Sequence, residues 1–98
     1  MQYNFEWDPK KAKRNNQKHN ITFELAATVF RDPRMLTIFD EEHSEFEERW
    51  VTLGLARNGI LVLVVHTFDE VDENNITIRI ISARKATKKE KNQYQELL

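Results

Sequence analysis

The fold is decided by the stretch RWVTLGLARNGILVLVVHTF, residues 49–68. Two apolar runs rich in β-branched residues, Arg49 to Ala56 and Ile60 to Phe68, flank the dipeptide Asn58-Gly59, which favours a two-residue hairpin turn. A third such run, Ile76 to Arg84, follows the acidic segment Asp69 to Asn75, which we expect to be a turn. The pattern predicts a three-stranded antiparallel meander.

Upstream of this meander the chain predicts a strand followed by a helix. Aromatic residues alternate with polar ones from Tyr3 to Trp7, which is the period of a half-buried strand. Asp8-Pro9 then combines a capping carboxylate with a proline at the first helical position. The helix should run to about His19 and end at Asn20, a residue type that tolerates the left-handed cap conformation.

A second helix and an edge strand should follow. Thr22 can cap a helix whose apolar residues, from Phe23 to Phe30, recur at spacings of three and four. Asp32-Pro33 ends that helix, and Met35 to Phe39 is expected to be a short edge strand. Asp40 to Glu48 holds six acids in nine residues and predicts an exposed loop.

The chain should close with a third helix. Thr87 and Glu90 have the spacing of a capping box. This helix is expected to turn Tyr94, Leu97 and Leu98 toward the core, and Lys88, Lys89 and Lys91 toward water. The predicted fold is an α+β domain covering residues 1–98, with an antiparallel sheet and helices on one side of it.

Composition limits the chemistry that this domain can perform. The 98 residues include no cysteine, which excludes disulfides, thiolate metal sites and a cysteine nucleophile. The three histidines are scattered and show no metal-ligand spacing, so we expect neither a metal nor a cofactor. No secretory signal opens the chain, and the longest apolar run, Ile60 to Val65, is too short to span a bilayer. We therefore expect a cytoplasmic address and no membrane partner.

The net charge of −1 hides an uneven distribution. Residues 1–22 carry five Lys/Arg and two acids, residues 23–78 four and twelve, and residues 79–98 six and two. Basic ends around an acidic middle favour one cationic surface for a polyanion such as RNA. Solvated helix faces would give the same charge pattern, so both interpretations stay open.

One basic ridge can be placed on the first helix. Lys10, Arg14 and Lys18 follow one another at intervals of four and fall on one face. Such a ridge can bind RNA phosphates through release of counterions, together with His19 and with Lys88 of the last helix. A plain solubilising helix remains the alternative.

The predicted hairpin register suggests a site for proton transfer. A two-residue turn at Asn58-Gly59 would place Val51 opposite His66, and Arg49 on the same face as His66 one diagonal step away. A cation beside an imidazole can stabilise phosphate charge and move a proton. Alternatively, His66 is a hydrogen-bonded histidine with a structural role, and Arg49 pairs with Glu47 or Glu48.

Two arginines interrupt the last strand. Arg79 lies among isoleucines, where a guanidinium is costly unless it meets an acid or an anion. Arg84 follows near the end of the strand, and arginine grips phosphate with two parallel hydrogen bonds. Because the two positions differ by an odd number, a regular strand puts them on opposite faces. They share a site only if a bulge or the strand end redirects one of them.

The sequence resembles the BrnT family of toxins. The resemblance covers nearly the whole chain and is carried by Phe5-Glu6-Trp7-Asp8-Pro9, Asn15, Lys18-His19-Asn20-Ile21-Thr22-Phe23, His43-Ser44, Glu47-Glu48-Arg49-Trp50, Gly54, Ile78–Thr87, Glu90 and Tyr94. Asn20 departs from the glycine usual in the family, and both residue types serve a helix C-cap.

The resemblance implies a RelE/ParE-like fold and a type II toxin that cuts RNA without a metal and stops translation. It implies a BrnA-like antitoxin whose DNA-binding dimer holds two toxins in a 2:2 complex on its operator. The matching segments offer Arg79 and Arg84 for phosphate binding and Arg49 for positioning the RNA, with His19, His66 and Tyr94 as further candidates for proton transfer.

Two other functions remain open. One is a toxin-fold protein without cleavage activity that serves as a partner or co-repressor in a DNA-bound complex. The other is a RelE/ParE-like toxin with a protein target such as a topoisomerase. RNA cleavage in EDTA, binding without cleavage, and inhibited supercoiling with intact RNA would distinguish the three.

Overall fold

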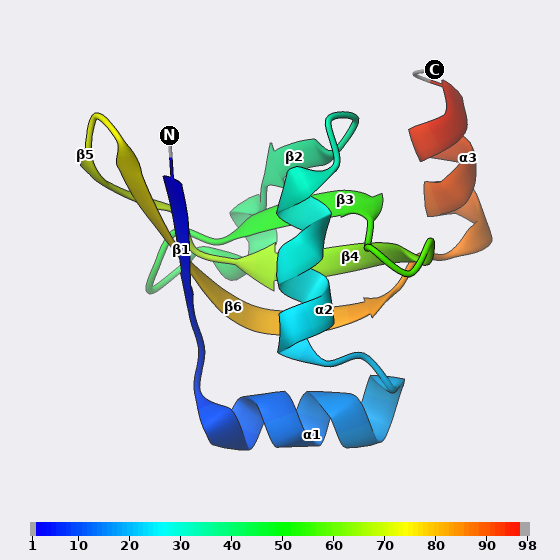
Figure 1. The fold of residues 1–98 in the computed structure, drawn as a ribbon, viewed down its shortest axis with the longest axis horizontal. Helices are drawn as coiled ribbons and strands as arrows, with labels where there is room; N and C mark the ends of the chain where they lie inside the picture. Colours follow the sequence, from blue (N-terminus) through cyan, green and yellow to red (C-terminus); the bar gives the residue numbers. More distant parts are fainter. Residues whose placement is uncertain (1, 97–98) are drawn as a thin grey trace.

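The fold is seen in a computed structural model, which describes residues 2–96 (Figure 1). Its elements in chain order are β1 (Gln2–Glu6), α1 (Pro9–His19), α2 (Phe23–Ala27), the 3₁₀ turn η1 (Thr28–Arg31), β2 (Leu36–Phe39), the 3₁₀ turn η2 (Glu41–His43), β3 (Trp50–Leu55), β4 (Leu61–His66), β5 (Asp69–Asp72), β6 (Asn75–Lys85) and α3 (Lys88–Glu96). Leu97 and Leu98, expected in the core, lie outside the described residues.

The strands form one mixed sheet in the order β1-β6-β4-β3-β2, with β5 also paired to β6. The antiparallel meander of β3, β4 and β6 and the edge position of β2 are confirmed. The expectation of a wholly antiparallel sheet is wrong, because β1 pairs with β6 in parallel, from Gln2 opposite Asn75 to Glu6 opposite Arg79. Every other element except α3 lies between these two strands in the chain, so no hairpin forces them to be antiparallel.

The segment Asp69 to Asn75 is also more ordered than expected. Asp69–Asp72 forms β5, which pairs with the first part of β6. The Asp72 carboxylate accepts hydrogen bonds from the backbone N–H of Asn74 and the side chain of Asn75, at 2.8 and 3.0 Å. The chain reverses direction between Asp72 and Asn75, and the residues before this turn form the exposed strand β5.

The β3–β4 hairpin has a three-residue loop, Arg57 to Gly59, and the predicted two-residue turn is wrong. Gly59 adopts a positive φ of 83° and donates its N–H to the Ala56 carbonyl at 2.9 Å. The extra residue shifts the register by one, so that Trp50, rather than Val51, faces His66. A one-residue shift moves side chains to the other face of a strand.

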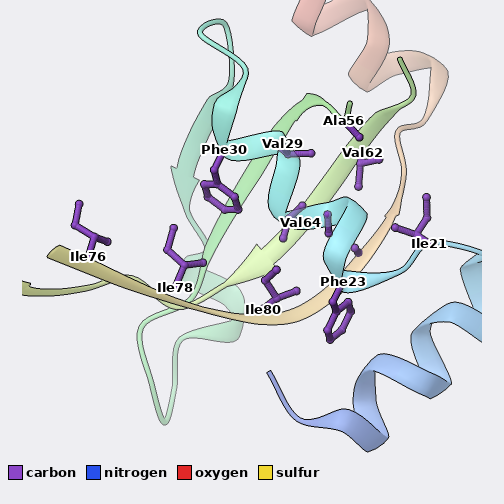
Figure 2. Close-up of a cluster of buried hydrophobic side chains, with 12 residues drawn as sticks. Ile21, Phe23, Val29, Phe30, Ala56, Val62, Val64, Ile76, Ile78 and Ile80 are labelled. Atoms are coloured by element: carbon purple, nitrogen blue, oxygen red, sulfur yellow. The ribbon is translucent and has the colours of Figure 1, made fainter. Parts of the chain in front are cut away.

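Helices α1 and α2 cover one face of the sheet, and the main core lies between them and the strands (Figure 2). Its buried side chains are Ile21, Phe23, Ala26, Val29, Phe30, Ala56, Val62, Val64, Ile76, Ile78, Ile80 and Ala83. Gly54 permits the close approach of η1, since a Cβ there would stand 2.9 Å from Cγ1 of Val29. Asn15 fixes α1 to the sheet by donating to the carbonyls of Ile21 and Ala83 and accepting from the Ala83 N–H.

The predicted starts of the three helices and the predicted end of α1 are confirmed by their caps, whereas the predicted helix from Phe23 to Phe30 is wrong in its second half: α2 ends at Ala27, and the 3₁₀ turn η1 continues to Arg31. Asp8 accepts the Lys10 N–H at 2.8 Å, Asn20 closes α1 with a φ of 56°, and Thr22 accepts the Leu25 N–H at 3.1 Å. Thr87 and Glu90 exchange the two hydrogen bonds of a capping box, at 2.8 and 3.2 Å. None of the helices within residues 2–96 is long and apolar enough to cross a membrane.

The expectation that all helices lie on one side of the sheet is wrong for α3. Tyr94 of α3 packs on Leu53 and Leu61, which belong to the face opposite α1 and α2. We call this opposite face the open face. Since α3 covers only the hairpin end of it, the rest of the open face stays accessible.

Candidate active site

Arg79 and Arg84 lie on the same face of β6 because the strand contains a bulge. His66 pairs with Ile80 and Val65 with Ser82, so Ile81 is an extra residue without a partner on β4. The extra residue reverses the alternation of side chains beyond it. Ile78, Ile80 and Ala83 are thus buried under the helices, and both arginines point to the open face. The sequence allowed Arg79 and Arg84 to share a site only if the strand contains a bulge or its end redirects one of them, and the bulge is present.

The open face carries a groove of about 420 Å³, which we call the arginine trough. It is lined by Ile38, Phe39, Asp40, His43, Arg49, Val51, Leu63, Val65, Ile81, Ser82 and Arg84. Strands β2, β3, β4 and β6 supply an apolar floor, while Arg49, Arg84, His43 and Asp40 supply its charged or titratable side chains. A floor of this kind suits the faces of bases or riboses, and its cations suit a phosphate.

Glu47 joins Arg49, which lines the trough, to Arg79, which does not. One carboxylate oxygen lies 3.4 Å from Nη2 of Arg49, and the other forms an ion pair with Nη2 of Arg79. All three side chains remain about one-third exposed. The Nε of Arg49 is buried and has no hydrogen-bond partner among the described residues.

Arg84 is held at one side of the trough by the first turn of α3. Its Nη1 and Nη2 donate to the two carboxylate oxygens of Glu90 at 2.8 and 3.0 Å. The hydrogen bonds from Arg84 lower the pKa of Glu90 to about 2, and the pKa of Arg84 is raised by the same bonds. The Arg84 side chain is still 39% exposed, so the paired guanidinium keeps donors free for a second anion.

His66 lies in the core and away from the trough, so the predicted pairing of Arg49 and His66 on one face is wrong. Its Nδ1 lies 2.9 Å from the Thr67 carbonyl, and its Nε2 lies 2.7 Å from the Thr52 hydroxyl, which itself bonds Thr37 at 2.8 Å. Burial lowers the pKa of His66, although the bond to Thr67 opposes the shift. A fully buried, neutral imidazole with both nitrogens hydrogen-bonded fits the structural interpretation.

Tyr94 is also separate from the arginine cluster. Its hydroxyl donates to Asp32 at 2.6 Å. Burial and this carboxylate raise the pKa of Tyr94 to about 12. The ring anchors α3 on Leu53 and Leu61, and it does not line the trough.

The cationic residues of α1 lie apart from the trough. Lys10, Arg14 and Lys18 are exposed on α1, which packs against β6 through Asn15 on the helix-covered side. His19 is half-buried at the end of the same helix, and Lys88 is exposed at the start of α3. The structure therefore places Arg49 and Arg84 in the trough and joins Arg79 to Arg49 through Glu47, while the other predicted RNA-binding residues lie elsewhere.

Sequence reasoning gave no part in the site to Asp40 and His43, and it offered Glu47 only as one of two acids that could pair with Arg49. Glu47, Asp40 and His43 belong to the acidic segment that was predicted to be only an exposed loop. His43 Nδ1 lies 3.0 Å from the Asp40 carboxylate, and His43 lines the trough. A histidine and several acids within nine residues of Arg49 were the available signal. Across residues 2–96, no group of three His, Asp or Glu is arranged to hold a metal ion.

Comparisons with known proteins bear on the family and the fold of the chain. The family model described as "Ribonuclease toxin, BrnT, of type II toxin-antitoxin system" matches residues 7–90. No curated protein matches the chain. The crystal structure of the Brucella abortus ribonuclease toxin BrnT is similar in fold, with a TM-score of 0.59 and 19% identity over 90% of this chain and 100% of that one. The match over residues 7–90 shows that the chain belongs to the BrnT family of ribonuclease toxins of type II toxin–antitoxin systems.

Proposed function

We propose that this chain is a metal-independent RNA endonuclease of RelE-like type, with the arginine trough as its active site. The proposal rests above all on the bulge at Ile81, which turns Arg79 and Arg84 to the face that also carries Arg49. The guanidinium groups of Arg49 and Arg84 beside an apolar floor fit a phosphate flanked by riboses and bases. Arg79 is joined to Arg49 through Glu47.

The chemistry follows from what guanidinium groups do to a phosphate. A ribose 2′-hydroxyl attacks the adjacent phosphorus, and negative charge builds on the non-bridging oxygens. Preorganised cations in a partly dry site stabilise that charge, and removal of one such group typically costs about 10²–10³ in rate. Arg79 and Arg84 perform this task, while Arg49 positions the RNA through the exposed part of its guanidinium group. The products are a 2′,3′-cyclic phosphate and a 5′-hydroxyl.

The same family membership supports the rest of the proposal. Cleavage of cytoplasmic RNA stops translation, and a BrnA-like DNA-binding antitoxin neutralises the toxin in a 2:2 complex that binds operator DNA through the antitoxin. The exposed lysines of α1, with His19 and Lys88, add contacts to the RNA backbone outside the cleavage site.

The ion pairs of the trough favour a second candidate function. Glu47 and Glu90 already occupy the three arginines, which is the arrangement expected of a purely structural network. In that case the protein serves as a non-catalytic partner or co-repressor in a DNA-bound complex with its antitoxin.

One experiment tests the proposal. Purified protein is incubated with labelled RNA in EDTA, beside Arg79→Ala, Arg84→Ala and the control Arg57→Ala, whose side chain is exposed on the hairpin loop. We expect cleavage with cyclic phosphate ends by the wild type and the control, and a loss of at least 100-fold in both other variants. Intact RNA with retained antitoxin binding would favour the non-catalytic function. Inhibited supercoiling with intact RNA would point to a topoisomerase target.

A further inference from the structure

The acidic segment between β2 and β3 places a carboxylate and an imidazole beside Arg49. Glu47 and His43 line one hollow of about 220 Å³ together with Arg49, and His43 and Arg49 also line the arginine trough. The two hollows therefore share a cation and a histidine. Metal-free cleavage of RNA needs a group that removes the 2′-hydroxyl proton and a group that protonates the leaving 5′-oxygen.

Glu47 has the position required of the proton acceptor. Its carboxylate contacts Arg79, which we assign to the phosphate, and Arg49, which we assign to positioning the RNA. An incoming phosphate carries the same kind of charge and can replace the carboxylate on these cations. The displaced carboxylate then lies next to the bound phosphate, which is where a 2′-hydroxyl would be found. Its side chain is 36% exposed, so the exchange requires no opening of the core.

His43 has the arrangement of a proton donor. Its Nδ1 lies 3.0 and 3.2 Å from the two carboxylate oxygens of Asp40. Because an ionised carboxylate only accepts hydrogen bonds, Asp40 keeps the proton on Nδ1 of His43. Nε2 is then the nitrogen that gives up or takes a proton. The ring is 64% exposed, so this nitrogen is accessible to a ligand in the trough.

We propose that Glu47 is the general base and His43 the general acid of RNA cleavage, with Asp40 as a positioning residue. Glu47 takes the proton of the 2′-hydroxyl as the O2′–P bond forms. The P–O5′ bond breaks, and O5′ takes a proton from Nε2 of protonated His43. The assignment rests on the proposed ribonuclease function, and it adds which side chains move the protons.

The test uses two substrates and a set of matched variants. One substrate is an RNA oligonucleotide with a single cleavable ribose; the other carries a 5′-bridging sulfur at that linkage, so that the leaving thiolate needs no proton. The variants are Glu47→Gln, Glu47→Asp, His43→Gln and Asp40→Asn, with Glu41→Gln as a control from the same exposed segment, because Glu41 lines neither hollow. Single-turnover rates and Kd are measured for each, and circular dichroism checks folding.

On the normal substrate we expect Glu47→Gln and His43→Gln to lose about 10²–10⁴ in rate, as removal of a general base or acid does. Glu47→Gln should bind RNA as tightly as the wild type or more tightly, because a carboxylate leaves the arginines. On the sulfur substrate His43→Gln should regain a rate close to that of the wild type, whereas Glu47→Gln should stay slow. Asp40→Asn should lose less than His43→Gln and should be rescued in the same way.

Four other results would contradict the proposed roles or the proposed function. If Glu47→Gln binds RNA more tightly and cleaves as fast or faster, Glu47 is only an inhibitory counter-ion of the arginines. Equal losses by His43→Gln on both substrates would exclude a proton-donor role. If Glu47→Gln unfolds, Glu47→Asp decides the role of the carboxylate, and a rate equal to that of the wild type would overturn it. Wild-type protein that cuts neither substrate would instead contradict the proposed function itself.

Discussion

Arg79 and Arg84 are five positions apart on β6 and yet point to the same face of the sheet. The bulge at Ile81, opposite the step from Val65 to His66, produces this relationship. Five residues of regular strand would direct Arg84 under the helices, where Ala83 and Ile80 are buried. The bulge therefore both protects the core from a charge and assembles the cationic trough. Bulges beside active sites commonly redirect a side chain in this way.

The exposed ridge of α1 should contribute to affinity and not to cleavage. In the triple variant Lys10→Ala, Arg14→Ala and Lys18→Ala, we expect weaker RNA binding and a slope of log K against log salt that is shallower by up to about 2, at roughly 0.7 per lost phosphate contact to a single strand. The cleavage rate at saturating RNA should not change. Fluorescence anisotropy across a salt series measures the slope, and Lys89→Ala on α3 is the control. A slope equal to that of the wild type would show that the ridge is only solvated.

Asn15 should be among the most important polar residues for stability. Asn15→Ala removes the partners of both the N–H and the carbonyl of Ala83 in a buried position. Unsatisfied buried groups of this kind cost about 1–3 kcal/mol each, so we expect a loss of about 2–4 kcal/mol. Urea unfolding gives the value, and Asn16→Ala, at an exposed position, should stay within about 0.5 kcal/mol of the wild type. A loss below 0.5 kcal/mol for Asn15→Ala would contradict this role.

Tyr94 should prove structural. Tyr94→Phe loses the hydrogen bond from the hydroxyl to Asp32 and keeps the ring on Leu53 and Leu61. The cost should be about 1–2 kcal/mol of unfolding free energy, with single-turnover cleavage within twofold of the wild type. Thermal unfolding and cleavage assays on the same sample separate the two effects. A folded Tyr94→Phe protein without cleavage activity would make Tyr94 catalytic.

Because of Glu90, the free energy of unfolding should decrease when the solution is made acidic. Because its pKa is about 2 in the folded protein and ordinarily 4.5, folding is stabilised by its ionised form above pH 4.5, and this contribution is lost as pH falls from 4.5 toward 2. Its value should be about 1–2 kcal/mol, since the pair with Arg84 is partly exposed. Glu90→Gln should flatten the dependence of unfolding free energy on pH in this window. Glu70→Gln, exposed on β5, should leave it unchanged. Identical pH curves for Glu90→Gln and the wild type would rule out the assignment.

Local signals predicted most of the fold. The caps at Asp8, Asn20 and Thr22 and the capping box at Thr87 define helix ends through a few neighbouring atoms, and such signals are readable within a short window. The hairpin register was wrong because Asn58-Gly59 fits both a two-residue turn and a three-residue loop with glycine last. The parallel pairing of β1 with β6 joins segments about 70 residues apart, and no local pattern specifies it.

The site was predictable only in part for the same reason. Arg49, Arg79 and Arg84 were recognisable as charges in strand-like surroundings, but their common face depends on the bulge at Ile81, which arises from pairing with β4. Glu47 joins the site through contact with Arg79, which lies 32 positions away in the chain. The sequence of an acidic segment alone predicts an exposed loop. Its contact with Arg79 depends on the tertiary structure.

The most direct test is to map where RNA binds. A 2′-O-methyl RNA oligonucleotide, which lacks the internal nucleophile, is titrated into ¹⁵N-labelled protein while backbone amide and arginine Nε–H signals are followed. The arginine trough predicts the largest shifts at Val51, Val65, Ser82 and the Nε–H groups of Arg49 and Arg84. Shifts confined to Lys10, Arg14 and Lys18 of α1, with the arginine side chains unchanged, would contradict the trough as the RNA site.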